Sequence, residues 1–137
     1  MSWAGTALLA AGLAAAVPVA ATVDGIDRHR WTARLLVVVA PDESDAALAE
    51  QRGAFAASER GSLERDLVLV EAVGSSAEAQ AIRRRFSVPA GSFRAILVGK
   101  DGEAKLASDA PIAPERLFAA IDGMPMRRDE MRRAGGR

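Results

Sequence analysis

Hydrophobic residues fall into four blocks that predict the strands of a sheet. The runs "WTARLLVVVA" (31–40), "DLVLVEAVG" (66–74) and "RAILVG" (94–99) are rich in β-branched residues. They are apolar on both faces, which is typical of strands covered on both sides by other elements. The fourth block, "EAKLAS" (103–108), is shorter and more polar, and the turn sequence "GKDG" joins it to the third. We therefore expect the last two strands to form an antiparallel hairpin.

The first helix is predicted directly after the first strand, in "PDESDAALAEQRGAFAASERG". Ser44 or Asp45 can cap it, because a side-chain oxygen at that position accepts a hydrogen bond from a free N–H of the first turn. The inner face of this helix would carry Leu48 and Phe55, and Gly61 would end it.

Two further helices are predicted from their end signals. The segment "SSAEAQAIRRRF" has a serine cap, an acidic first turn and three arginines, 83–85, near its end, where cations suit the helix dipole. The segment "APERLFAAIDG" has Pro114 at the first helical position and Gly123 past the end. The order β, α, β, α, β, β, α predicts an α/β fold, a mixed sheet of about four strands with helices on both faces.

A chain of 137 residues fits one domain. We expect four parts: a signal peptide or membrane anchor, a polar linker, the α/β domain and an arginine-rich tail of one or two helical turns. In chain order these parts are residues 1–21, 22–30, 31–123 and 124–137.

The N-terminal part contains no charged residue from Met1 to Val23. This part begins with an apolar block, which is followed by Pro18 and by small residues ending at Ala21. That order of regions indicates a cleaved secretory signal. No Lys or Arg precedes the block, so an uncleaved anchor and a soluble helix stay open as alternatives, although Ala and Gly partition weakly into lipid. A signal or an anchor would make the domain periplasmic or secreted.

Composition excludes several classes of function. Eighteen basic and 18 acidic side chains cancel, and only 4 % of residues are aromatic, so nothing favours nucleic acid as a partner. The absence of cysteine excludes thiol-disulfide oxidoreductase or peroxidase chemistry and zinc–thiolate sites. The single histidine, His29, lies in the linker between two arginines and is interpreted as solvated.

Four segments resemble a known family: "RWTARLLVVVAP", "ERDLVLVEAVG", "RRRFSVPAGSFRAILVGKDGEAKL" and "LFAAIDGMPMRRDEM". Residues from about Trp31 to Met131 are similar to the bacterial branch of the DUDES domains, a family of unknown function related to extracellular sushi-repeat proteins of animals. The element order resembles the thioredoxin and peroxiredoxin superfamily. The resemblance implies a thioredoxin-like fold and an exported location, and it implies no activity and no catalytic residue.

The thiol positions of that superfamily can be compared with this chain. Aligning Ala-Pro at 40–41 with the Ala-Pro before the thioredoxin cysteines puts Glu43 and Ala46 in the cysteine positions. Aligning Pro41 with the peroxiredoxin motif puts Leu48 in that position. The peroxiredoxin arginine that stabilises the thiolate corresponds to Arg94 in "FRAILVGKDG".

The candidate site is therefore a corner formed by Asp42, Glu43, Asp45 and Arg94. One interpretation is structural, since the three carboxylates would cap a helix and complement its dipole. Another pairs them with Arg94 in an ion pair or a polar ligand pocket. A Ca²⁺ site is a third and weaker interpretation, because the spacing lacks the Asp-x-Asp-x-Asp-Gly pattern. We expect no metal and no cofactor.

Two other features are interpreted as structural. "GKDG" lacks the spacing and the following helix of a phosphate-binding loop, so it is expected to be a turn. The arginine-rich tail is expected to be a solvated terminus, with contact to an acidic partner, a polysaccharide or membrane phosphate as the alternative.

These observations favour an exported, non-redox binding or interaction domain. Its partner would be an unknown protein or a small anionic ligand, with membrane contact only through a possible uncleaved N-terminal segment. The alternative is a non-thiol enzyme that uses Arg94 with an acid or base from the loop 42–45. A third hypothesis is a structural partner whose arginine tail docks on another chain.

Overall fold

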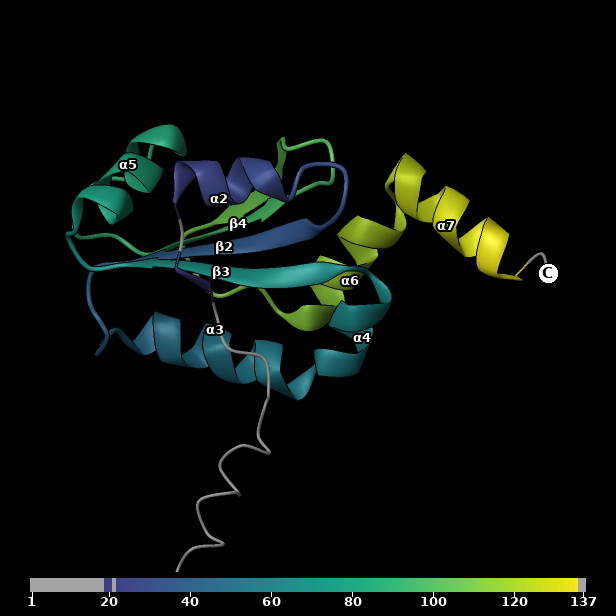
Figure 1. The fold of residues 1–137 in the computed structure, drawn as a ribbon. Helices are drawn as coiled ribbons and strands as arrows, with labels where there is room; N and C mark the ends of the chain where they lie inside the picture. Colours follow the sequence, from purple (N-terminus) through teal and green to yellow (C-terminus); the bar gives the residue numbers. More distant parts are fainter. Residues whose placement is uncertain (1–18, 21, 136–137) are drawn as a thin grey trace, which may run out of the picture.

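The computed structural model describes residues 19–20 and 22–135, and in this part of the chain five strands form one mixed sheet (Figure 1). In sheet order they are β1 (Val19–Ala20), β3 (Leu67–Val73), β2 (Arg34–Ala40), β4 (Arg94–Val98) and β5 (Ala104–Ser108). Strand β3 is parallel to β1 and β2, whereas β4 is antiparallel to both β2 and β5. The predicted α/β class and the predicted hairpin are confirmed, and the arrangement is compatible with a thioredoxin-like fold.

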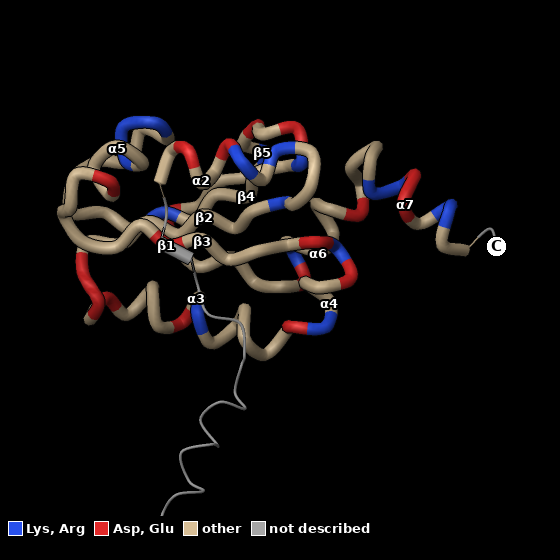
Figure 2. The backbone as a smooth tube through the Cα atoms, in the orientation of Figure 1, with Lys and Arg blue, Asp and Glu red and all other residues tan. Residues whose placement is uncertain are grey.

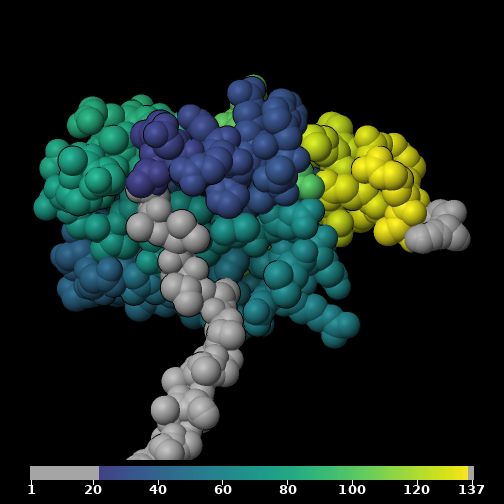
Figure 3. All heavy atoms as spheres, viewed as in Figure 1, coloured from purple at the N-terminus to yellow at the C-terminus, as the bar shows by residue number. Residues whose placement is uncertain are grey.

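Helices cover both faces of the sheet (Figure 1). One face carries α2 (Val23–Arg28) and α5 (Ala77–Arg85). The other carries α3 (Ala46–Ala57), α4 (Glu59–Glu64) and α6 (Pro114–Asp122). The last helix, α7 (Pro125–Gly135), follows α6 and projects from one end of the body (Figure 3). None of the described helices is long and apolar enough to cross a membrane.

Strand β2 is buried along its whole length, so its alternating side chains supply two cores. Leu36 and Val38 belong to the core under α3 and α6, and Val37 and Val39 belong to the core under α2 and α5. This explains why the sequence of β2 is apolar at every position after Arg34. Each side chain of β2 therefore packs on one defined face of the sheet.

Two parts of the expected organisation differ from the structure. Residues 22–30, expected to be a linker, include α2, because Thr22 accepts a hydrogen bond from Gly25 N (2.8 Å) and Ile26 is buried against the sheet. The tail forms the eleven-residue helix α7 instead of one or two turns. The predicted signal peptide or anchor lies outside the described residues except for β1.

The prediction that Gly61 ends a helix was wrong. Gly61 lies inside α4, and a Cβ at this position would come within 2.5 Å of the Phe118 ring. The glycine is therefore needed for the close approach of α6 to α4, and the first helix ends earlier, at Ala57.

A buried polar clamp joins α3 to the segment before α6. The Gln51 amide donates to Ile112 O (3.0 Å) and accepts from Ile112 N (2.7 Å), and both residues are buried. Every hydrogen-bonding group of this contact thus has a partner, as a buried polar group requires.

Candidate functional site

The acidic loop after β2, residues 42–45, leads directly into the first turn of α3. Asp42 accepts hydrogen bonds from Ser44 Oγ (2.6 Å) and Ser44 N (2.9 Å), and these bonds lower the pKa of Asp42. Asp45 is the N-cap of α3 and accepts from Leu48 N at 3.0 Å. The loop therefore acts as a helix cap, with Asp45 rather than Ser44 as the capping residue.

The third acidic residue of the loop pairs with an arginine of α3. Glu43 Oε1 lies 3.0 Å from Arg52 Nη2, and the same guanidinium binds Glu71 of β3 at 2.6 Å. The hydrogen bond to Glu71 is the main reason that the pKa of Arg52 is raised. Arg52, and not Arg94 as the sequence predicted, is therefore the cation that pairs with Glu43 of the acidic loop.

Arg94 lies elsewhere and has a different carboxylate partner. Its guanidinium binds Asp109 just after β5 at 2.9 Å, and Nη1 donates weakly to Ser87 O at 3.4 Å. Arg94 alternates with Ala95 along β4, and Ala95 faces the α3 core, so the Arg94 side chain is on the α5 face. The expected pairing of Arg94 with the acidic loop is therefore not formed, because the sheet separates them.

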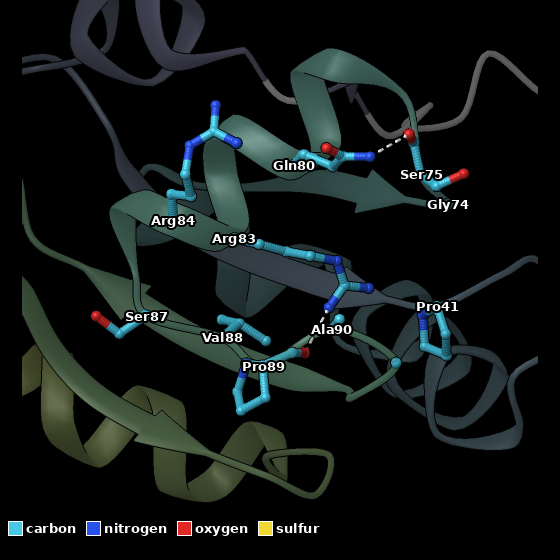
Figure 4. A pocket seen from close by; sticks show the side chains of 11 residues that line it. Pro41, Gly74, Ser75, Gln80, Arg83, Arg84, Ser87, Val88, Pro89 and Ala90 are labelled. Atoms are coloured by element: carbon cyan, nitrogen blue, oxygen red, sulfur yellow. Dashed lines mark hydrogen bonds between the residues drawn. The ribbon is translucent and has the colours of Figure 1, made fainter.

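A cavity of about 540 Å³ lies nearby, where the parallel strands β2 and β3 end. Pro41 follows β2, Gly74 follows β3, and the other walls come from α5 and the loop before β4 (Figure 4). In α/β sheets ligands bind preferentially outside the carboxyl ends of the strands. We call this the carboxyl-edge cavity; its lining is Pro41, Gly74, Ser75, Gln80, Arg83, Arg84, Ser87, Val88, Pro89, Ala90 and Gly91.

Arg83 is the one charged residue of this lining that is buried, at 8 % exposure. Its side chain extends toward Pro41 and the loop before β4, whereas the exposed Arg84 points away from them (Figure 4). Arg83 Nη1 donates to Pro89 O (3.0 Å) and to Ser92 O (3.1 Å). The guanidinium thus both anchors the loop and faces the cavity.

The end of α5 fixes where the cavity loop begins. Ser87 N donates to Arg84 O (3.3 Å) and Val88 N donates to Arg83 O (2.8 Å), which is the Schellman pattern of a helix C-terminus. Ser87 takes the left-handed conformation (φ 56°) that this motif normally gives to glycine. A strained serine therefore stands at the mouth of the cavity.

A tight turn completes the loop. Ser92 N donates to Pro89 O at 3.2 Å, and Gly91 has a φ of 77° at the third position of the turn. A positive φ at that position is the requirement of a type II turn, which glycine meets without strain. The turn brings two carbonyl oxygens to Arg83 and leaves the face beside Pro41 open.

Arg83 has no carboxylate partner in the described part of the chain, and its Nε and Nη2 have no hydrogen-bond acceptor there. Figure 2 shows that basic positions gather at the end of α5. The Nε and Nη2 nitrogens of Arg83 are not among the buried unpaired polar atoms of the described residues, so they are open to solvent at the cavity. A guanidinium offers an anion in the cavity two parallel N–H donors, as it does for carboxylate or phosphate.

A family model described as "Domain of unknown function (DUF4174)" matches residues 25–130, well over half of the chain. The chain belongs to this family. The match starts within α2 and ends within α7, so the DUF4174 domain includes parts of both helices.

Sequence reasoning missed the role of Arg83 in the DUF4174 domain, although a signal was present. Ala79, Ile82 and Arg83 share the buried face of α5, since they are spaced three and four residues apart. From the sequence, Arg83 was interpreted only as a cation that suits the helix dipole. Its position on the apolar side of the helix predicted burial.

No group of three or more His, Cys, Asp or Glu side chains that could hold a metal ion occurs among the described residues of the DUF4174 domain. The carboxyl-edge cavity has no acidic residue and no histidine among its lining residues. It can therefore bind and orient an anion, and its described lining offers no general acid or base near neutral pH.

Proposed function

We propose that this DUF4174 domain is a non-redox, thioredoxin-like binding domain that holds a small anionic ligand in the carboxyl-edge cavity. The observation that carries the proposal is the buried guanidinium of Arg83, which faces the cavity with no carboxylate partner among the described residues. A cavity of about 540 Å³ is in the size range of small-molecule sites.

The chemistry of the cavity supports binding rather than catalysis. Its lining combines Arg83 with apolar groups such as Pro41 and Val88, which would contact an organic body while the arginine holds the charge. The alternative enzyme requires Arg94 to act with the loop 42–45, and these groups lie on different sides of the sheet. No observation of the structure favours that alternative.

We also propose that the domain works after export, in the periplasm or outside the cell. The support is the uncharged apolar sequence from Met1 to Val23, which has the order of regions found in secretory signals. The measurement is mass spectrometry of the N-terminus of the protein recovered from its native cell. Recovery from the cytosol with Met1 in place would contradict the export proposal.

The test of the binding proposal is titration of the full chain with sodium sulfate, inorganic phosphate and sodium succinate, followed by calorimetry and by the melting temperature. We expect saturable binding of at least one of these anions, and a rise in melting temperature, since a ligand at 100 times its Kd stabilises by about 2.7 kcal/mol. Sodium chloride at equal ionic strength is the reference, because it screens charges without bidentate recognition.

The variant Arg83→Met keeps the apolar stem and removes the charge, and we expect it to weaken anion binding at least tenfold. Arg83→Lys keeps the charge but loses the planar fork, so we expect a smaller loss. Arg116→Met is the matched control, because Arg116 is an exposed arginine of α6 on the other face. Equal anion binding by Arg83→Met and the wild type would refute the proposal.

A further inference from the structure

Arg34, at the start of β2, is fully buried and is held by the last helix. Its Nη1 and Nη2 each donate to one carboxylate oxygen of Glu130, both at 3.2 Å, and Nη1 also donates to Arg65 O at 2.8 Å. Glu130 lies on α7, 96 positions away in the sequence. The carboxylate of α7 thus neutralises a charge in the interior of the sheet.

Lys100 completes a basic socket for the same carboxylate. Its Nζ lies 2.8 Å from Glu130 Oε2 and 2.9 Å from Asp66 Oδ2, and its side chain is 10 % exposed. Burial raises the pKa of Glu130, but the hydrogen bonds from Arg34 and Lys100 outweigh this effect, so the pKa of Glu130 is lowered. Glu130 is therefore ionised at neutral pH, and it holds α7 by charge.

Apolar packing contributes little to the docking of α7, which has no buried residue among its described positions. Its second polar attachment is Arg127, which donates to Asp122 Oδ1 (3.0 Å) and to Glu64 O (3.2 Å). Most tertiary helices are held by an apolar face, whereas α7 is held by ion pairs near its middle and projects beyond them (Figure 3). Such a helix can leave the body without exposing a hydrophobic core.

A second cavity, of about 720 Å³, adjoins this socket at the end of the sheet opposite the carboxyl edge. Arg34 and Lys100 form part of its lining, Pro125 and Met126 at the start of α7 form another part, and Trp31 forms a third. Trp31 is 58 % exposed and has a φ of 71°, which is rare for a bulky residue. The position of α7 thus determines the shape of this cavity.

We propose that Glu130 is a latch that docks α7 reversibly in the Arg34–Lys100 socket, and that release of α7 opens the cavity beside Trp31. Release lets water solvate Arg34, so the sheet stays folded while the helix moves away. This inference concerns the end of the sheet opposite Arg83 and does not depend on the proposed function.

The test is hydrogen exchange of the α7 amides, read by mass spectrometry, in the full chain. We expect Glu130→Ala to speed exchange in 125–135 at least tenfold while the amides of β2 keep their protection. Alanine is the best helix former, so the faster exchange cannot come from a weaker helix propensity.

Asp129→Ala is the matched control, because Asp129 pairs with Arg132 of the same helix. We expect it to leave α7 exchange within about twofold of the wild type. A second readout is quenching of Trp31 fluorescence by acrylamide in a Trp3→Phe background, which should increase in Glu130→Ala only. Unchanged α7 exchange in Glu130→Ala, or equal loss of protection in β2, would overturn the latch.

Discussion

Arg34 and Arg83 are both buried arginines next to cavities, and they lie at opposite ends of β2 and differ in their partners. Arg34 binds the carboxylate of Glu130, whereas Arg83 binds two carbonyl oxygens and has no carboxylate among the described residues. The first arrangement satisfies the charge within the chain, and the second leaves it for a ligand. Burial of a cation is thus insufficient to identify a site, and its counter-ion must be examined as well.

The largest expected effect is a difference in the free energy of unfolding between variants of the two arginines. Arg34→Met should lower the free energy of unfolding by about 2 kcal/mol, since Glu130 and Arg65 O lose buried hydrogen bonds. Arg83→Met should change it by less than about 0.5 kcal/mol, because removal of an unpaired buried charge offsets the lost bonds to carbonyl groups. Urea denaturation measures both. Equal losses would show that Arg83, like Arg34, is structural.

A smaller effect is expected at the mouth of the carboxyl-edge cavity. Ser87→Gly should raise the free energy of unfolding by about 1 kcal/mol, because glycine takes the left-handed conformation without strain. Thermal and urea unfolding measure this gain. The affinity for sulfate should stay the same, since Ser87 shapes the cavity through its backbone conformation and glycine keeps that conformation. A loss of affinity would instead place the Ser87 hydroxyl on the bound anion.

The smallest effect concerns pH. The pKa of Glu130 is lowered in the fold, so its contribution to stability is present above the ordinary pKa and is lost as the pH falls through the lowered value. The free energy of unfolding should therefore decrease as the pH is lowered from about 5 to about 3, and this decrease should be smaller in Arg34→Met. Urea denaturation at each pH measures it.

The affinity of the carboxyl-edge cavity for sulfate should depend little on pH. It should change less than about twofold between pH 7 and pH 5, because the described lining around Arg83 has no group that titrates there. A marked change in that interval would place a titrating group near the bound anion.

The regular elements were largely predictable because each one depends on local pattern. The apolar runs that became β2, β3 and β4 needed no tertiary information, and the hairpin turn and Pro114 marked their elements in the same way. Gly61 was misread because its reason is the Phe118 ring, which lies far along the chain. Helix α7 was underestimated because its stability comes from Arg34 and Lys100, which no local pattern contains.

The candidate site was harder to predict than the fold. The sequence placed Arg94 and the acidic loop at one edge of the sheet, and their backbones are indeed close, since Val39 is the register partner of Arg94. Alternation along β4 then turns the Arg94 side chain to the face opposite α3. The face that the first residue of a strand uses depends on register, and the register of β4 is defined by its pairing with β2 and β5.

The ion pair between Arg34 and Glu130 also has a consequence for where the domain can be cut. The boundary at Gly123 predicted from the last helix signal would remove Glu130 and leave Arg34 with no carboxylate. The family match instead extends to residue 130. A shortened chain that is meant to keep Arg34 paired with its carboxylate therefore has to include residues 124–130, even though this stretch buries no side chain of its own.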